Sequence, residues 1–467
     1  MSVQAKAAIW YAVCNIIQKG IIFLTTPVFS RLLTTEEYGL YNVFTTWQSV
    51  IIVLVSLNLA SGVYMRGLIK YEEDIDTFAS SLHSLFAVVF SVGFGIYLAG
   101  AGFWSRLLDI PVPYMLCMFA DMLAAVAFHF WSSWQRVYYR YKSLIVLTIV
   151  NAVLKPGMGV ICILLSDQAL SARIYSMTAA DVLCFGGLLI WMWSGNKRVS
   201  VKYWRYALTY NLPLVPHYLS QIILNHSDRL MIKALTGASQ AGIYSLAYTL
   251  SSIMVVVNQA ILNSFNPWMY RQMKKGKYDG IGRYSIGLLI LLAAGNLFVI
   301  LLAPELIFIM APSSFHEAIW LMPPVTMSAF FMFMYSLFAN IEFYFEKTKF
   351  MMAASVSGAA LNILLNYIFI RKAGYIAAGY TTLVCYLCYC FAHYLMMRRI
   401  LAEYLPGQTI YNIRRILLIS LVFVGAGFLM MLFYRHPMIR YLLAIAAMVM
   451  AICCRSRIAG VLRKPEE

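Results

Sequence analysis

The sequence predicts an all-α membrane protein with about 14 transmembrane helices, arranged as two six-helix lobes plus two C-terminal helices. Three observations predict this class. Hydrophobic residues make up 62% of the 467 positions and charged residues only 12%, whereas a soluble domain carries roughly 25% charged residues. Apolar runs of about 20 residues recur along the chain, and each is long enough to cross a bilayer. Two segments about 200 residues apart also resemble each other.

The internal repeat relates residues 31–41 to residues 228–244. Each segment ends in a Gly-x-Tyr element, which closes at Tyr41 in the first copy and at Tyr244 in the second, an offset of 203 residues. Parallel repeats of hydrophobic spans are typical of transporters that rock one half of the molecule against the other. We therefore expect two lobes related by a pseudo-two-fold axis.

The apolar runs define the expected spans in order along the chain. We place them at residues 9–30, 40–64, 80–104, 112–134, 143–166, 171–193, 208–228, 241–266, 284–310, 318–343, 351–370, 375–397, 416–434 and 438–454.

Two polar connections divide these spans into groups. Basic and aromatic residues alternate over residues 194–207, as in a helix that lies among lipid headgroups. A basic stretch at residues 398–415 follows the twelfth span. We therefore expect an N-lobe at residues 1–195 and a C-lobe at residues 196–400, which begins with an amphipathic linker at 196–207. Two additional spans and a cytoplasmic tail occupy residues 401–467.

The net charge of +17 is interpreted as membrane topology. The tails and the even-numbered connections hold 25 Lys and Arg residues, and the odd-numbered connections hold 9. The positive-inside rule then places both termini in the cytoplasm. Nucleic-acid binding is excluded because no connection is long enough to fold into a basic domain.

Several catalytic and metal-binding classes are also excluded. No G-x-x-x-x-G-K-[ST] motif occurs, so energy has to come from an ion gradient or from the substrate. The nine cysteines lie in expected spans or at their ends, without His or carboxylate at ligand spacing, and are interpreted as packing residues. We expect no catalytic residue, no metal site and no cofactor, and H⁺ or Na⁺ as the coupling ion.

Ionisable residues inside the spans are few, and each costs roughly 2.5–3.5 kcal/mol to insert, so each needs a partner, water or a function. Lys19 lies in the first span and Lys155 in the fifth, directly before Pro156. Two cations in one lobe suggest a site for an anionic group such as a phosphate. The alternative is internal neutralisation, in which either lysine pairs with Asp121 or Asp181.

Three carboxylates are candidates for the coupling-ion site, because a buried carboxylate can exchange a proton or bind Na⁺. They are Asp121 in the fourth span, Asp181 in the sixth and Glu342 in the tenth. A structural hydrogen-bonding role is the alternative for each. Arg31 and Arg66 lie at span ends, where snorkelling to headgroups is the usual role.

Three blocks of the sequence resemble Wzx-type oligosaccharide flippases, which form the polysaccharide biosynthesis branch of the MOP exporter superfamily. Residues 26–41 read Thr-Pro-Val-Phe-Ser-Arg-Leu-Leu-Thr-Thr-Glu-Glu-Tyr-Gly-Leu-Tyr, which is similar to the N-terminal signature of that family. Residues 206–248 resemble the opening of its second lobe and contain Asp228-Arg229. Residues 362–382 resemble a third block with several departures. Drug exporters of the MATE branch share the fold but lack the Glu-Glu-Tyr-Gly-x-Tyr motif.

The resemblance implies a function that composition alone does not. It implies transfer of undecaprenyl-pyrophosphate-linked oligosaccharide, such as an O-antigen or capsule repeat unit, from the inner to the outer leaflet of a bacterial plasma membrane. Other polysaccharide assembly proteins are the implied partners. In the family a cation-lined cavity receives the pyrophosphate, and the resemblance implies Lys19 and Arg66 as contacts. Lys155, from the charge argument above, and Arg31 complete the expected substrate contacts. Asp228 and Arg229 form a family-typical pair with a gating or structural role.

Two other functions stay open at this point. The first is a MATE-like, cation-coupled drug exporter, which shares the expected architecture. The second is a membrane glycan polymerase or ligase, although the short connections lack the water-exposed acidic cleft that such enzymes need.

Overall fold

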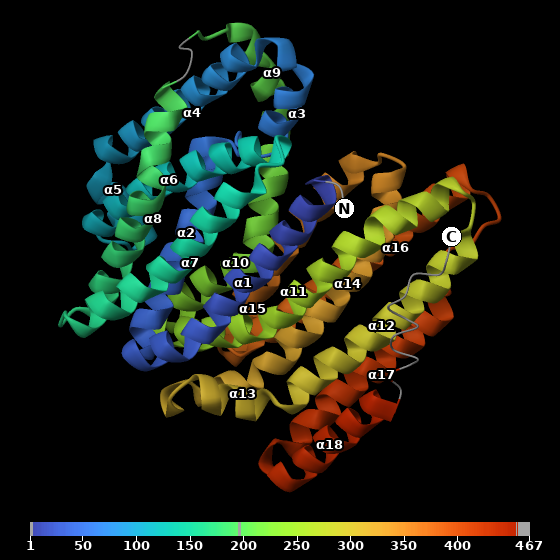
Figure 1. The fold of residues 1–467 in the computed structure, drawn as a ribbon. Helices are drawn as coiled ribbons and strands as arrows, with labels where there is room; N and C mark the ends of the chain where they lie inside the picture. The colour runs from blue at the N-terminus through green and yellow to red at the C-terminus, as the bar shows by residue number, and fades with distance from the viewer. Residues whose placement is uncertain (1–2, 195–197, 454, 456–467) are drawn as a thin grey trace. The chain divides into compact units, whose positions relative to one another are not determined.

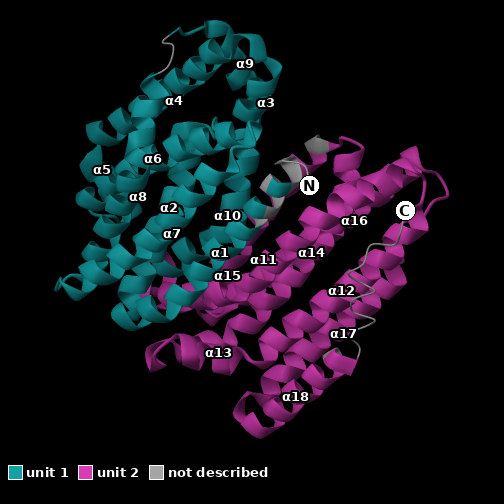
Figure 2. Cartoon of the chain, in the orientation of Figure 1, with its two compact units in different colours: residues 1–233 teal, residues 234–467 magenta. Residues whose placement is uncertain are grey.

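The computed structural model describes residues 3–194, 198–453 and 455, and these form helices and connections without a β-strand. The chain folds into two compact units, residues 1–233 and 234–467 (Figure 2). Part of the expected linker, 195–197, and most of the expected tail, including Arg457, Arg463 and Lys464, lie outside the described residues. The division expected from the sequence into 1–195, 196–400 and 401–467 stays a prediction about the repeat.

The first unit contains ten helices and two short 3₁₀ turns among its described residues (Figure 1). They are α1 (Val3–Leu32), α2 (Thr35–Ser56), α3 (Gly62–Lys70), η1 (Glu72–Asp74), α4 (Ile75–Ala99), α5 (Ala101–Leu108), α6 (Val112–Val137), α7 (Tyr141–Leu164), α8 (Ala169–Ser194), α9 (Val201–Asn211), η2 (Leu212–Leu214) and α10 (Val215–Thr236), which crosses the boundary between the units.

The second unit is also helical throughout its described elements. They are α11 (Ala238–Lys274), α12 (Tyr278–Leu301), α13 (Ala303–Met310), η3 (Ser313–Trp320), α14 (Met322–Tyr344), α15 (Thr348–Ala373), α16 (Ala377–Tyr404), α17 (Ile413–Leu432), η4 (Phe433–Arg435) and α18 (Pro437–Cys453).

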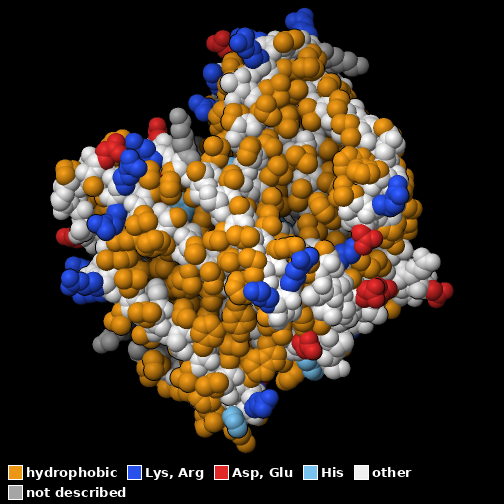
Figure 3. All heavy atoms as spheres, turned by 180° about the vertical axis from the view of Figure 1, so that it is seen from behind, with side chains coloured by type: hydrophobic (Ala, Val, Ile, Leu, Met, Phe, Trp, Pro, Cys, Tyr) orange, Lys and Arg blue, Asp and Glu red, His pale blue; other side chains and the backbone are white. Residues whose placement is uncertain are grey.

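Twelve of the described helices are long and apolar enough to cross a membrane. The all-α membrane class is therefore confirmed, and hydrophobic side chains cover broad areas of the face in Figure 3. Two of the fourteen expected spans do not reach this standard. The span expected at 208–228 corresponds to α10, which carries Asp228, Arg229 and Lys233 within two turns. The span expected at 438–454 corresponds to α18, whose apolar stretch is short.

The repeated sequence element begins a helix in each unit. The side chain of Thr34 accepts a hydrogen bond from the backbone N–H of Glu37, whose carboxylate accepts the Thr34 N–H at 2.9 Å. This reciprocal capping box satisfies two otherwise unpaired donors at the start of α2. In the second copy, Gly237 precedes α11 with a φ of 118°, a conformation that favours glycine. Gly39 and Gly242 of the two Gly-x-Tyr elements are both buried.

The core of the first unit is rich in aromatic rings. Tyr64, Phe78, Phe86 and Phe130 are completely or almost completely buried in one cluster. Tyr64 meets the edge of Phe130 with ring centroids 4.8 Å apart. Such edge-to-face pairs add about 0.5–1.5 kcal/mol beyond burial of their area.

The amphipathic linker forms α9 and packs onto α3 and α4. The Tyr203 hydroxyl donates to the Asp74 carboxylate at 2.7 Å, and the Trp204 indole N–H donates to the Ser81 carbonyl at 2.7 Å. The hydrogen bond to Asp74, together with desolvation, raises the pKa of Tyr203 to about 12. The Lys70 ammonium lies 4.8 Å from the centroid of the Tyr206 ring. These contacts explain why α9 belongs to the first compact unit.

Helix α14 is the central element of the second unit. Of its most apolar 18-residue stretch, 83% is buried inside the structure. The helix contacts α11, α12, α16 and α17. The long helices around it run side by side in Figure 1. A helix that is apolar on all sides is suited to this position because each face meets another helix.

The C-terminal helices are tied to this unit by polar contacts. Arg440 on α18 donates from Nη1 to Oε2 of Glu305 on α13 at 2.9 Å, and its Nη2 lies 2.8 Å from Oε1. The Tyr434 hydroxyl donates to the Ile300 carbonyl at 2.7 Å. Because the Arg440 side chain is 4% exposed and that of Glu305 is 21% exposed, this bidentate pair is largely shielded from water.

Removal of the Arg440 guanidinium should destabilise the second unit. In Arg440→Ala, Glu305 loses its buried partner, and we expect about 2–4 kcal/mol lower stability, since breaking a buried pair leaves an uncompensated charge. A thermal unfolding series in detergent measures the effect, with exposed Arg435→Ala as the control. The double variant Arg440→Ala/Glu305→Ala should recover part of the loss. Equal midpoints for Arg440→Ala and Arg435→Ala would contradict the expectation.

Candidate functional site

A buried ion pair joins α7 and α8 in the middle of the first unit. Lys155 and Asp181 form a salt bridge between Nζ and Oδ2. The other carboxylate oxygen of Asp181 accepts a hydrogen bond from the Asn151 amide at 2.8 Å. The Asp181 side chain is 4% exposed and that of Lys155 is 29% exposed. Lys155 therefore reaches a less enclosed environment than its partner.

A second carboxylate extends this pair to two further helices. Asp121 on α6 accepts a hydrogen bond from the amide of Gln48 on α2. Asp121 lies within hydrogen-bonding reach of Asp181 and within electrostatic range of Lys155. We call Gln48, Asp121, Asn151, Lys155 and Asp181 the polar cluster. It unites three of the residues predicted from the sequence.

The charges of the polar cluster do not balance when every group is ionised. One ammonium faces two carboxylates, which leaves a net charge of −1 in a region where Asp121 and Asp181 are each 3% exposed. Burial of an unpaired charge is very costly, so one proton shared between the carboxylates makes the cluster neutral. The arrangement can thus take up and release a proton, or accept another cation in its place.

Arg173 is a functional candidate that was not predicted from the sequence. It lies on α8 two turns before Asp181, and its guanidinium is 3.7 Å from the centroid of the Phe29 ring and 4.9 Å from that of Tyr41. The residue is 8% exposed. Its Nε and Nη1 groups are buried without a hydrogen-bond partner in the described part of the chain. In the sequence Arg173 lies near the start of the expected span 171–193, where an arginine is expected to reach the headgroups, so its burial was not predicted.

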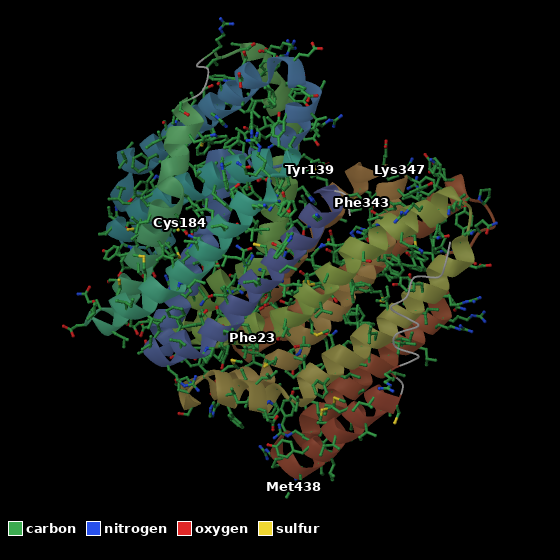
Figure 4. All side chains as sticks on the ribbon, in the orientation of Figure 1. Phe23, Tyr139, Cys184, Phe343, Lys347 and Met438 are labelled. Atoms are coloured by element: carbon green, nitrogen blue, oxygen red, sulfur yellow. The ribbon has the colours of Figure 1, made fainter. Side chains whose placement is uncertain are left out.

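Gly159 on α7 makes room for this arginine. A Cβ atom at Gly159 would lie 2.3 Å from Nη1 of Arg173 and 3.2 Å from the Phe29 ring. A larger residue at this position would push the end of the Arg173 side chain away from the place that it occupies over Phe29. The helix that carries Arg173, α8, can be followed in Figure 4 from the labelled Cys184.

The other predicted cations of the first unit are found outside the polar cluster. Lys19 is exposed on α1, within electrostatic range of His226 on α10. The exposed Arg66 lies 5.4 Å above the Tyr210 ring. Arg31 donates from Nη1 to the Pro27 carbonyl at 2.9 Å.

The pair Asp228 and Arg229, expected from the sequence to have a gating or structural role, is buried in α10, with exposures of 1% and 6%. The Arg229 guanidinium lies 2.6 Å from Nδ1 of His226, one turn earlier. The imidazole nitrogen can therefore act as an acceptor for the guanidinium. This local contact fixes the direction of the Arg229 side chain along its own helix.

The second unit contains a fully enclosed carboxylate and imidazole. Oε1 of Glu342 on α14 lies 2.8 Å from Nδ1 of His393 on α16, and both side chains are 0% exposed. The His393 ring packs against Tyr389, with centroids 4.5 Å apart, and against Tyr335 at 5.5 Å. Oε2 of Glu342 and Nε2 of His393 have no hydrogen-bond partner among the residues described.

Glu342 was predicted from the sequence, whereas its partner was missed. His393 lies inside the expected span 375–397, so the same criterion that selected Asp181 would have selected it. A carboxylate and an imidazole can hold a proton between them and remain a neutral or an ion-paired unit. The pair is therefore a second place where a proton can reside.

The sequence is similar to a known protein family and to a protein of Haemophilus influenzae. The family model described as "Polysaccharide biosynthesis protein" matches residues 5–273. The chain is 20% identical over 369 residues to Lsg locus putative protein 1 of Haemophilus influenzae, covering 75% of this chain and 87% of that protein.

Solved structures share the fold at low sequence identity. The inward closed conformation of lipid II flippase MurJ superposes with a TM-score of 0.73 at 12% identity, covering 96% of this chain and all of that one. An inward-facing multidrug resistance MATE family transporter of the MOP superfamily gives a TM-score of 0.68 at 12% identity, over 85% of this chain and all of that one. These neighbours are transporters and flippases rather than enzymes.

The matched residues of the family model include every member of the polar cluster and most of the first unit. They also include the capping box at Thr34 and the start of α11. Because the match covers more than half of the 467 residues, the chain belongs to the family of polysaccharide biosynthesis proteins.

Proposed function

We propose that the protein moves an undecaprenyl-pyrophosphate-linked oligosaccharide from the inner to the outer leaflet of a bacterial plasma membrane by alternating access. The observation that carries the proposal is the polar cluster of the first unit, which lies entirely within the residues matched by the family model. The similarity in fold to a protein named as a lipid II flippase supports a lipid-linked cargo.

Lys155 is the central cargo contact in this proposal. The Lys155 side chain is 29% exposed and that of its partner Asp181 is 4% exposed, so the lysine is the more accessible member of the pair for a phosphate oxygen. A diphosphate would compete with Asp181 for the ammonium, and a proton taken up by the carboxylates would offset the negative charge that arrives. Lys19, Arg66 and Arg31 are proposed as further phosphate contacts.

Coupling to an ion follows from the same charge balance. Asp121 and Asp181 both lie within electrostatic range of a single lysine, and Glu342 lies 2.8 Å from the His393 imidazole in the second unit. We propose that H⁺ or Na⁺ enters at the carboxylates of the polar cluster when the cargo binds Lys155. Asp228 and Arg229 are proposed to hold α10 in its structure rather than to contact cargo.

Transport by purified protein tests the function directly. In vesicles with an imposed ion gradient, we expect transfer of fluorescent undecaprenyl-pyrophosphate-linked sugar across the bilayer, and no accumulation of small cationic dyes. The similarity to a MATE transporter makes the dye the proper competing substrate. Movement of the dye without movement of the lipid-linked sugar would replace this proposal with drug export.

Substitutions in the polar cluster should separate cargo binding from folding. Lys155→Ala leaves Asp121 and Asp181 without their cation, so we expect reduced protein levels as well as lost transport. The variant Lys155→Ala/Asp181→Asn removes both charges, and it should restore the protein level while transport stays at least about tenfold below that of the wild type. Exposed Lys142→Ala is the matched control. Recovery of transport in the double variant would mean that Lys155 has only a structural role.

The enclosed pair of the second unit should affect coupling rather than cargo binding. Glu342→Gln keeps the shape of the side chain but cannot exchange a proton, and His393→Gln removes the imidazole. If the coupling ion is H⁺, both variants should lose the acceleration of transport by a pH gradient while they still bind lipid-linked sugar. Initial rates with and without a gradient measure this. A full response to the gradient in both variants would exclude the pair from coupling.

A further inference from the structure

A cavity of about 280 Å³ lies at one end of the first unit, apart from the polar cluster. Its lining comes from the first turns of α4, the last turns of α6 and α8, and the turn between α6 and α7. Tyr139, labelled in Figure 4, marks that turn. Because these elements all meet the cavity at their ends, it lies at the level where transmembrane helices reach the lipid headgroups.

His83 is one of the most deeply buried side chains of the cavity lining, and both of its ring nitrogens have hydrogen-bond partners. Nδ1 of His83 lies 3.2 Å from the Met192 carbonyl, and Nε2 lies 3.3 Å from the Tyr64 hydroxyl. Both imidazole nitrogens are therefore occupied. Trp191 and Trp134 form the walls, with ring centroids 6.0 Å apart at an angle of 78°. The cavity thus offers aromatic surfaces rather than free polar atoms at its base.

The mouth of the cavity presents one negative and one positive side chain. Asp76 of α4 and Arg140 of the α6–α7 turn both line it and are both exposed. No salt bridge between them occurs in the described structure, although both act electrostatically on Tyr138. Ser194 also lines the mouth, and its hydroxyl donates to the Trp191 carbonyl at 2.9 Å, which leaves its oxygen as an acceptor.

We propose that this cavity binds the phosphoethanolamine headgroup of a membrane phospholipid. The ammonium would be held by the Asp76 carboxylate and the Ser194 oxygen against the tryptophan walls, and the phosphate would be held by the Arg140 guanidinium. An ammonium is attracted both to a carboxylate and to the face of an indole ring. The opposite charges at one mouth match a headgroup that itself carries both signs.

The chemistry distinguishes this headgroup from related ones. A primary ammonium can donate three hydrogen bonds to Asp76 and Ser194, whereas a trimethylammonium group has no N–H to donate. An anionic glycerol headgroup supplies the phosphate but leaves Asp76 without a cation. A neutral sugar ring could stack on the tryptophans but would leave the charges of both Asp76 and Arg140 unused. The cavity therefore favours phosphatidylethanolamine over phosphatidylcholine, phosphatidylglycerol and free sugar.

Lipid binding to the purified full-length protein tests the proposal. Native mass spectrometry after titration with phosphatidylethanolamine, phosphatidylcholine or phosphatidylglycerol of identical acyl chains gives relative affinities. We expect phosphatidylethanolamine to bind about tenfold more tightly than phosphatidylcholine, since hydrogen bonds to a charged group are worth about one such factor. Asp76→Asn should abolish this preference. Arg140→Gln should weaken the binding of both phosphatidylethanolamine and phosphatidylcholine.

Matched variants on the same segments control for general changes in charge. Glu73→Gln and Lys142→Gln alter exposed residues that do not line the cavity, and both should keep the wild-type preference. Elution of each variant as a folded monodisperse species shows that the structure is intact. Equal affinities of the wild type for the three lipids would overturn the proposal, as would equal effects of Asp76→Asn and Glu73→Gln. Displacement of the lipid by free sugar would assign the cavity to a saccharide instead.

Discussion

Neutralisation of buried charge inside a helical bundle is the constraint on which the first unit depends. Lys155 on α7 is paired with Asp181 on α8, and this pairing matters because a charge in an apolar bundle is costly unless an opposite charge neutralises it. Asp121 and Gln48 extend the requirement to α6 and α2. One charge thus fixes the side chains of four helices relative to one another. Any ligand that takes the lysine away from Asp181 has to change this balance.

The second unit meets the same constraint with different chemistry. Glu342 is paired with an imidazole, whose charge depends on a single proton, and the pair is sealed by the rings of Tyr335 and Tyr389. Glu305 is paired with a permanently charged arginine and has a structural function. The two units are therefore both helical, but their buried ionisable groups differ.

Sequence patterns predicted the fold class and part of the site. Long apolar runs identified the spans because membrane insertion depends on local hydrophobicity. Helix α10 lies outside the length and hydropathy criterion that twelve described helices meet, and it carries Asp228 and Arg229. Asp181 and Lys155 were found because charges inside an apolar run are visible in one dimension. Internal neutralisation was one of the two interpretations from the sequence. Which lysine meets which carboxylate, and the contact of Asp121 with Gln48, depend on the rotation of packed helices, which single-span periodicity does not specify. Arg173 was missed because burial by Phe29 and Tyr41 comes from two other helices.

The capping box between Thr34 and Glu37 has a consequence for the order in which the first unit can form. These two residues bond to each other across the first turn of α2, so they specify where the helix begins. Both hydrogen bonds lie within one turn and need no contact from another helix. The start of α2 can therefore be set locally, before Gln48 on the same helix meets Asp121 of α6.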